Sequence, residues 1–454
     1  MYFFFCGARY KTRFNFHLSV FYHFLFIFFQ PERDSMFLRH LPFLKAVFLY
    51  SFTAFGGPLG HMGMMVRFFV QKRKDITEEE LLEYNAFCQM LPGPSSTQTV
   101  MLIAMKRGGI PLALVTLLLW IFPAALIMSC LSFLLYYFDI KNIQTKLFIY
   151  ILPMSIGFIF FAAARMMRSS VKHLATTLIM IGSIIATVAI KSPWVFPGLL
   201  LVSGFISNFS DKRIPDSHEK PKPIKWVNLW LFAALFILAG LFSELALVHN
   251  WPHRRLFNIF ENFYRFGSIV FGGGQALLPM MLYQFVNRQM RLGHAPYLTS
   301  EQLLTGYGMV QAVPGPVFSV CSFVGGMAMA GGGHSGFFWQ MMGCIVATVG
   351  VFLPSTLLLF FFYPIYQNLK HHVIIYRSLE GINAAVVGII WASGFILFRT
   401  LMLDSNSIGF DAFSLNAWSN LVVVIITFSL LYFTKIPSPL IVLGWLLMGW
   451  AINL

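Results

Sequence analysis

Charged residues are scarce in this sequence, which argues against a soluble protein. They make up 11% of the 454 residues, whereas hydrophobic residues make up 57%. A soluble domain carries about 25% charged residues, so most of this surface does not face water. Strict polar–apolar alternation over about ten residues, which a membrane β-barrel needs, is also missing. Because backbone groups in lipid must be hydrogen-bonded within their own segment, the remaining solution is an all-α membrane protein.

Paired cysteines, metal motifs and nucleotide motifs are missing as well. The five cysteines are widely spaced and no Cys-x-x-Cys occurs, so neither a disulfide framework nor a zinc site is indicated. No Gly-x-x-x-x-Gly-Lys motif occurs, which argues against direct driving by ATP. We therefore expect no cofactor and no bound metal.

The net charge of +15 does not indicate a nucleic-acid-binding protein. The basic residues stand in short groups between apolar runs, such as Lys72, Arg73 and Lys74, and form no stripe along one face. Such groups are typical of cytoplasmic loops in multispanning proteins. We expect membrane lipid as a partner, no nucleic acid, and a multi-pass location in the cytoplasmic (inner) membrane. A homodimer stays open.

Apolar runs recur along the chain and predict about 10–14 transmembrane or re-entrant helices across a core of about 30 Å. The only long polar stretch, residues 209–226, contains three prolines and several lysines. We predict an N-terminal extension at 1–35, a first repeat at 36–208, a basic linker at 209–226 and a second repeat at 227–454. Met36 could be the true initiator, or residues 1–35 could form an extra helix, and both readings stay open.

The two groups of runs share motifs, and this predicts two related halves. Residues 77–94 align with residues 299–316 at a constant offset of 222, and eight of these eighteen positions are identical. Upstream, Phe-Gly-Gly at 55–57 matches 271–273 at an offset of 216. Two separate motifs in the same order make a chance similarity improbable, and fixed-period similarity is the mark of a repeat.

Each shared segment reads as a helix that starts, breaks and starts again. Thr77 with Glu80, and Thr299 with Gln302, form capping boxes. Both helices should end at Gln-x-x-Pro-Gly-Pro, because proline removes an amide donor and disfavours helix in the preceding residue. The second proline of each motif suits the first position of a new helix. A broken helix inside a membrane is tolerated where it lines a protein cavity.

The new helix starts are candidate anion sites. Their first amides have no helical partner, and the helix dipole favours negative charge there. Paired interruptions in two halves indicate a transport site near the midplane. The candidate substrate-binding residues are Gly56, Gly57, His61, Gln89, Pro92, Gly93, Pro94, Ser95, Ser96, Thr97 and Gln98 in the first half, and Gly272, Gly273, Gly274, Gln275, Gln311, Pro314, Gly315, Pro316 and Ser319 in the second.

At these motifs the chain resembles the chromate ion transporter family, in its long form with two homologous repeats. The resemblance covers roughly 37–205 and 255–450, with Phe-Gly-Gly-Pro at 55–58 followed by His61, and Pro-Gly-Pro in both halves. It implies a non-enzymatic secondary transporter of chromate, often outward, with sulfate as the structural analogue. The chain departs from the family at Leu102 and Ala104, where tyrosine and glycine are usual, and it lacks the tryptophan often found before the capping threonine.

Several alternatives stay open. The Pro-Gly-Pro breaks could be packing kinks, the glutamines helix–helix hydrogen bonds, and His61 a satisfied interface residue. Arg67, Lys106 and Arg288 could attract anions at a cavity mouth or, more simply, anchor in the lipid headgroups. A sulfate or other oxyanion carrier of the same fold is the main rival. An intramembrane enzyme would need Ser95 or Ser96 beside His61, and no orienting acid is evident.

Overall fold

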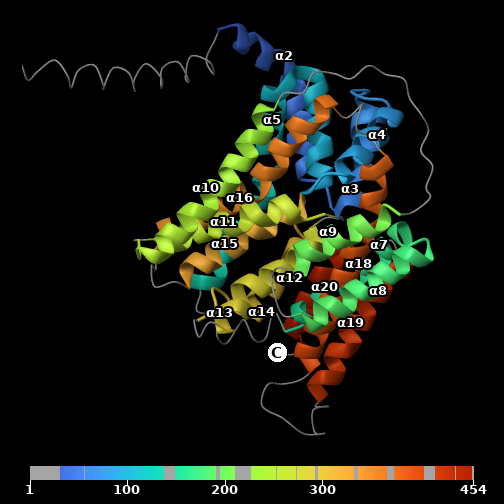
Figure 1. Cartoon of the computed structure of the whole chain (residues 1–454), viewed down its shortest axis with the longest axis vertical. Helices are drawn as coiled ribbons and strands as arrows, with labels where there is room; N and C mark the ends of the chain where they lie inside the picture. The colour runs from blue at the N-terminus through green and yellow to red at the C-terminus, as the bar shows by residue number, and fades with distance from the viewer. Residues whose placement is uncertain are drawn as a thin grey trace, which may run out of the picture.

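The chain folds as helices and short turns. The computed structural model describes residues 31–55, 57–137, 149–190, 195–209, 226–251, 253–271, 274–291, 295–331, 336–365, 373–402, 415–434 and 436–451, and no strand occurs among them (Figure 1). Residues 1–30 of the predicted extension at 1–35 and most of the linker at 209–226 lie outside these described residues. The all-α architecture expected from the sequence is confirmed.

The first half begins with a long helix and ends with three shorter ones. Its elements are α2 (Pro31–Ser51), α3 (Gly57–Met65), the π-helical η1 (Val66–Lys72), α4 (Glu78–Gln89), α5 (Ser95–Tyr137), α7 (Ile151–Ser170), α8 (Leu174–Ala189) and α9 (Val195–Ser207). Helix α5 is interrupted at Gly108 and Gly109, whose backbone angles are not helical. It therefore consists of two consecutive helices.

The second half repeats this order after one additional helix, α10. Its elements are α10 (Val227–Val248), α11 (Arg254–Ile269), η2 (Gly274–Ala276), α12 (Leu277–Met281), the π-helical η3 (Leu282–Asn287), α13 (Arg288–Arg291), α14 (Ser300–Val310), η4 (Val317–Ser319), α15 (Val320–Ala330), α16 (Phe337–Phe362), η5 (Tyr363–Ile365), α18 (Val373–Met402), α19 (Leu415–Phe433) and α20 (Ser438–Ala451). The two π-helical segments begin at Val66 and Leu282, which differ by the same 216 as the glycine motifs. The repeat therefore extends to an unusual local backbone conformation, of a kind often found at functional sites.

Both predicted capping boxes are confirmed. The Thr77 hydroxyl accepts the Glu80 amide at 3.2 Å, and a Glu80 carboxylate oxygen accepts the Thr77 amide at 3.1 Å. Thr299 and Gln302 make the same pair at 3.1 and 2.9 Å. Two backbone amides of each helix start are satisfied in this way, so α4 and α14 begin at equivalent positions.

The prediction that Pro94 and Pro316 are the first helical residues is wrong by one position. Helix α5 begins at Ser95 and η4 begins at Val317. Pro316 keeps extended backbone angles (φ −71, ψ 132), and the Pro94 carbonyl accepts the Gln98 amide at 3.0 Å. Both prolines act as caps, because a cap residue accepts the first helical hydrogen bond while its own backbone stays outside the helix.

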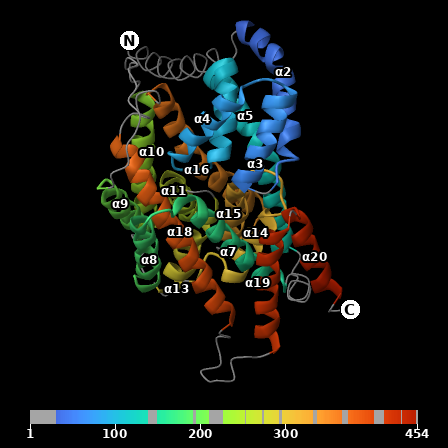
Figure 2. The same ribbon diagram turned by 90° about the vertical axis from the view of Figure 1, so that its right-hand side faces the viewer.

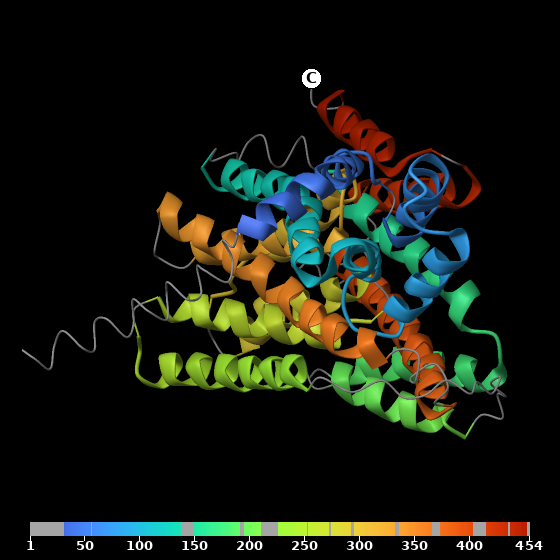
Figure 3. The same cartoon turned by 90° about the horizontal axis from the view of Figure 1, so that it is seen from above.

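The chain spans the membrane several times. Five helices among the described residues are long and apolar enough to cross it, namely Ser95–Tyr137, Ile151–Arg168, Val227–Val248, Phe337–Phe362 and Glu380–Arg399. Only 11% of the most apolar stretch of Val227–Val248 is buried. This helix, α10, lies at the edge of the molecule beside α11 (Figure 3). Exposed large apolar side chains such as Leu201 and Trp230 suit contact with lipid.

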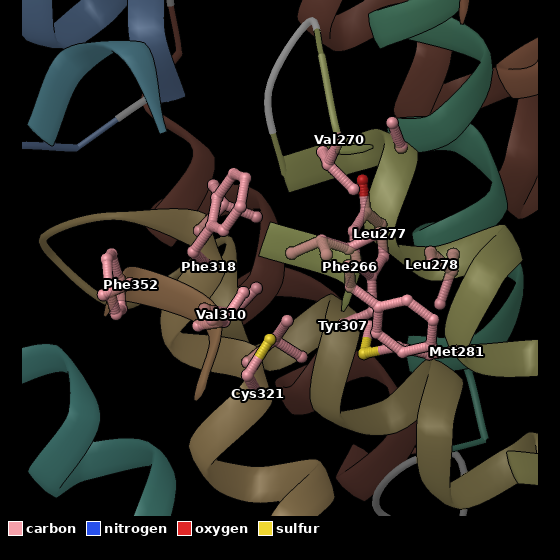
Figure 4. Packing of buried hydrophobic residues seen from close by; sticks show 14 of the residues in the cluster. Phe266, Val270, Leu277, Leu278, Met281, Tyr307, Val310, Phe318, Cys321 and Phe352 are labelled. Atoms are coloured by element: carbon pink, nitrogen blue, oxygen red, sulfur yellow. The ribbon is translucent and has the colours of Figure 1, made fainter. Parts of the chain in front are cut away.

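The two halves interleave and share one core. Helix α18 of the second half packs against α7, α8 and α9 of the first, and α5 packs against α15 (Figure 2). Figure 4 shows a part of the core in which Phe352 lies on the side of Phe318, with which it makes a ring contact, and Phe266 and Val270 lie on the other side of Val310. These side chains come from the helices around the second break, so the break is surrounded by packed apolar groups.

Candidate functional site

The two Pro-Gly-Pro turns are joined crosswise to the glycine motifs of the opposite half. The Gly93 amide donates to the Val270 carbonyl at 2.7 Å, and the Gly315 amide donates to the Ala54 carbonyl at 2.8 Å. Val270 and Ala54 are the residues just before Phe-Gly-Gly in each half, at the offset of 216. A two-fold relation between the halves would produce this reciprocity. The bonds bring both breaks and both glycine motifs into one region.

Both turn glycines are needed for their backbone angle and for their lack of a side chain. Gly93 has φ +110 and Gly315 has φ +113, which disfavours other residues. A Cβ on Gly93 would lie 2.3 Å from the Ser355 Cβ, and one on Gly315 would lie 2.9 Å from the Ala124 Cβ. Ser355 and Ala124 each directly follow a proline inside a long helix of the opposite half. Each turn is therefore pressed against a proline-containing helix of the other half.

His61 connects the first break to the second. Its Nδ1 lies 3.1 Å from the Ser96 hydroxyl at the start of α5. Its Nε2 is buried and makes no well-formed hydrogen bond within the described part of the chain, although the Ala54 backbone lies close to the ring. Because Ala54 also accepts the Gly315 amide, the histidine stands between the two helix starts.

Aromatic side chains hold the start of α5 in place. The Trp120 indole donates to the Thr97 hydroxyl at 3.0 Å. Its ring lies edge-on to His61 at 5.4 Å and stacks on Tyr50 at 4.9 Å. The Tyr50 hydroxyl donates to the His61 carbonyl at 3.0 Å. The side chains at the first break thus form a connected network, in which the hydroxyl groups of Ser96 and Thr97 already have hydrogen-bond partners.

Gln98 ties the first turn to α16. Its side-chain amide donates to the Pro92 carbonyl at 3.0 Å and approaches the Ser355 carbonyl at 3.5 Å. This leaves its Oε1 atom buried without a partner. A buried acceptor without a partner costs free energy, which a donating ligand or a water molecule would recover.

The second break has the clearest vacant donor. Ser319 is fully buried, and its hydroxyl makes no hydrogen bond to any residue that the structure describes. Its amide donates to the Pro316 carbonyl at 2.9 Å, so the helix begins with a tight turn. Gly274 packs against this turn, because a Cβ there would lie 2.7 Å from a Val317 methyl group. The Gln311 carbonyl accepts the Ser438 hydroxyl at 2.8 Å.

The structure separates some predicted residues from this centre. Gln89 is exposed, and Ser95, Gln311 and Pro314 are only partly buried. Pro92, Pro94 and Pro316 are buried at the turns, and Gly57 is the first residue of α3. Gly56, Gly272 and Gly273 lie outside the described residues, as does the side chain of Gln275.

Sequence reasoning missed the partners that lie inside long apolar helices. Tyr50, Trp120 and Ser355 contact the site, and Ala54 and Val270 supply its crossing acceptors. The prolines inside these apolar runs were an available signal for Ala124 and Ser355, which directly follow them. No motif pointed to Trp120, because an aromatic residue inside an apolar run is ordinary.

The site is neutral and suits recognition by hydrogen bonds. Among the described residues gathered at the two breaks, the polar groups are amides, hydroxyls, a histidine and a glutamine. Helix amides and hydroxyls can replace the water around a small anion without a formal positive charge. Ser96 and His61 also resemble a nucleophile–base pair, but no carboxylate is hydrogen-bonded to His61 among the described residues.

Comparisons with known proteins agree with the two-repeat organisation. The family model described as "Chromate transporter" matches residues 41–207 and 257–450. An uncharacterized transporter of Methanocaldococcus jannaschii is 26% identical over 436 residues, covering 93% of this chain and 97% of the relative.

Two further relatives differ in length. A chromate transport protein of Pseudomonas aeruginosa is 25% identical over 412 residues, covering 87% of this chain and 93% of that protein. An uncharacterized transporter of Bacillus subtilis is 27% identical over 198 residues, covering 43% of this chain and 96% of the relative. No solved structure matches the chain.

Proposed function

The chain belongs to the chromate transporter family, and from this premise we propose that it is a secondary transporter that moves chromate outward across the cytoplasmic membrane. The chromate transport protein of Pseudomonas aeruginosa supports this cargo, since it aligns over most of both chains. The described residues gathered at the breaks offer donors that suit a small tetrahedral oxyanion and carry no formal charge.

In this proposal the anion lies between the two broken helices. The free amides of Ser96 and Thr97 approach it from one side, and those of Val317 and Phe318 approach from the other. The Ser319 hydroxyl adds a donor. The two repeats have inverted orientation, and alternating access is a rocking of one half against the other.

One observation carries the proposal: the fully buried hydroxyl of Ser319, at the second helix start, has no hydrogen-bond partner among the described residues. It stands beside a turn that is bonded to the other half through Gly315 and Ala54. Leaving a buried hydroxyl unpaired costs about 1–3 kcal/mol. A structural kink would gain stability by replacing this serine with alanine, whereas a binding site keeps it for its ligand.

Ser319→Ala tests this reading. We expect the variant to be as stable as the wild type or more stable, because an unpaired polar group is removed, and to lose at least tenfold in chromate transport rate at low substrate concentration. Ser393→Ala is the matched control, since Ser393 is also buried but its hydroxyl donates to the Ile389 carbonyl within α18. Equal transport rates of Ser319→Ala and wild type would show that the Ser319 hydroxyl does not bind the transported anion.

The proposed cargo and direction are tested together by radiolabelled chromate uptake into inside-out vesicles. We expect uptake above that of empty vesicles, and we expect it to stop when the proton gradient is collapsed. A folded, inserted protein that carries no chromate would refute the cargo.

The second candidate is a sulfate or other oxyanion carrier of the same fold. The neutral donors at the breaks favour a tetrahedral oxyanion but do not distinguish chromate from sulfate, which has the same shape and charge. Competition decides between them, because a sulfate carrier binds sulfate at least as well as chromate. We do not propose an enzyme, since the Ser96–His61 pair has no orienting carboxylate among the described residues.

A further inference from the structure

Helix α11 carries a polar strip that leads toward the breaks. Asn258, Glu261, Asn262 and Arg265 recur at the spacing of one helix face. The opposite face of the helix packs into the apolar core. Arg265 lies five residues before Val270, which corresponds to about 7.5 Å along a helix, and Val270 accepts the amide of the first turn. The strip therefore ends close to the proposed binding site.

The charges on this strip do not balance. The Arg265 Nε atom lies 3.3 Å from a Glu261 carboxylate oxygen, and both side chains are about one-fifth exposed (19% and 20%). This Nε atom makes no well-formed hydrogen bond to the described residues, so the contact is an ion pair with poor geometry. The Nη2 group of the same guanidinium donates to the Asn262 side-chain oxygen. Arg288 of α13 is exposed, and its guanidinium donates to the Gln284 side chain at 3.3 Å. Phe285, three residues before it, packs on Phe266 of α11 with ring centroids 5.9 Å apart, so Arg288 lies near both groups. One carboxylate thus faces two guanidinium groups.

Hydrogen bonds hold the rest of the strip in position. The Arg255 guanidinium lies 4.5 Å over the Tyr297 ring and donates to the Ala328 carbonyl at 2.8 Å. The Tyr297 hydroxyl donates to the Asn258 side chain at 3.1 Å, and the Asn262 side chain donates to the Asn258 carbonyl at 2.7 Å. The polar groups are therefore ordered before any ion arrives.

The first half lacks this strip. At the offset of 216, the positions of Asn258, Glu261, Asn262 and Arg265 are occupied by Pro42, Lys45, Ala46 and Leu49. A purely structural element of the repeat would be expected in both halves. Ionisable residues within a membrane protein are costly and typically mark ion pathways. The strip is therefore a feature of the second half alone.

We propose that Arg265 and Arg288 form a second oxyanion subsite on the route to the breaks, and that Glu261 occupies Arg265 until the anion displaces it. This inference rests on the proposed function. A planar guanidinium group matches two oxygens of a tetrahedral oxyanion. The internal carboxylate keeps the arginine in place and sets the concentration at which the anion competes.

The test compares variants whose effects differ in sign. Arg265→Gln and Arg288→Gln should raise the KM for chromate uptake into inside-out vesicles about tenfold, with a smaller change in kcat. Glu261→Gln should lower the KM, because the anion no longer has to displace a carboxylate. Arg39→Gln is the control, since Arg39 is exposed on the equivalent helix of the first half, and it should leave the KM unchanged.

A structural ion pair predicts something else. In that case Arg265→Gln and Glu261→Gln would change the KM in the same direction and would lower the thermal midpoint of unfolding equally. This result would overturn the subsite, whereas the proposed transport function would still be supported by chromate uptake in the wild type. If Arg265→Gln does not fold, Arg265→Lys replaces it in the test, because lysine keeps the positive charge but lacks the planar guanidinium group.

A binding measurement separates failure of the subsite from failure of the function. Chromate and sulfate are each titrated calorimetrically into purified protein. Binding that weakens in Arg288→Gln supports the subsite even if vesicles carry no chromate. Wild-type protein that binds neither anion overturns the proposed function and the subsite together.

Discussion

The contact between Gly315 and Ala124 allows a quantitative test of the crossed breaks. Gly315→Ala places a residue with a side chain at φ +113, and its Cβ would lie 2.9 Å from the Ala124 Cβ. The backbone strain costs about 1–3 kcal/mol, and overpacking adds about 1–3 kcal/mol. We therefore expect Gly315→Ala to lower the free energy of unfolding by about 2–6 kcal/mol.

A second substitution should recover only the packing part. Ala124→Gly removes the facing Cβ and by itself costs about 0.5–1 kcal/mol inside a helix. Combined with Gly315→Ala, it should be less destabilising than the sum of the two single changes by about 1–3 kcal/mol, since residues in contact are coupled. Gly109→Ala is the control for strain alone, because Gly109 has φ +69 and its nearest neighbour is 3.8 Å away.

Thiol labelling provides the assay. Cys130 is exposed and is first replaced by serine, because its thiol would react in the folded protein. The buried Cys88, Cys321 and Cys344 should then react with a fluorogenic maleimide only as the protein unfolds in detergent. Chromate uptake is measured on the same preparations. If Gly315→Ala were no less stable than Gly109→Ala, or if Ala124→Gly recovered nothing, the two breaks would not be in contact as described.

Three further predictions concern the surroundings of the site. Thr299→Ala removes a capping box and should lower stability by about 1 kcal/mol, measured as the same unfolding midpoint, and an unchanged midpoint would refute the cap. Trp120→Phe leaves the Thr97 hydroxyl without its donor and should cost about 1–3 kcal/mol; adding Thr97→Val should recover part of this loss. The hydrogen bond from Lys106 holds the pKa of Glu80 below its usual value of 4.5. The pair's contribution should therefore be fully present above pH 4.5 and be lost as the pH falls further, so the difference in midpoint between wild type and Lys106→Gln should shrink on acidification.

The sequence was sufficient for the parts of the fold that local chemistry determines. Capping boxes, the ends of α4 and α14, and the helical architecture follow from residues that act within one or two turns. The repeat was visible because these local signals recur in order. The domain boundaries, the homodimer and the substrate-binding roles remain predictions.

The crossed contacts could not be read from sequence. Nothing in the segment around Gly93 indicates that its amide bonds to Val270, because such pairing depends on how distant helices pack. Trp120 and Ser355 were hidden for the same reason, inside runs whose composition only indicates a membrane helix. The sequence placed Gln89 and Ser96 in one candidate set, yet only Ser96 is buried beside His61.

The crossed bonds also make the two repeats depend on each other. Each repeat completes the turn of the other, since the acceptor for Gly93 is Val270 and the acceptor for Gly315 is Ala54. An isolated half would keep its own turn and lose the carbonyl that satisfies it. Joining the two repeats in one chain keeps each turn beside the carbonyl that its glycine amide needs. A substitution that displaces Ala54 or Val270 removes the hydrogen-bond acceptor from the turn of the other repeat. These four positions therefore couple the stability of the two halves.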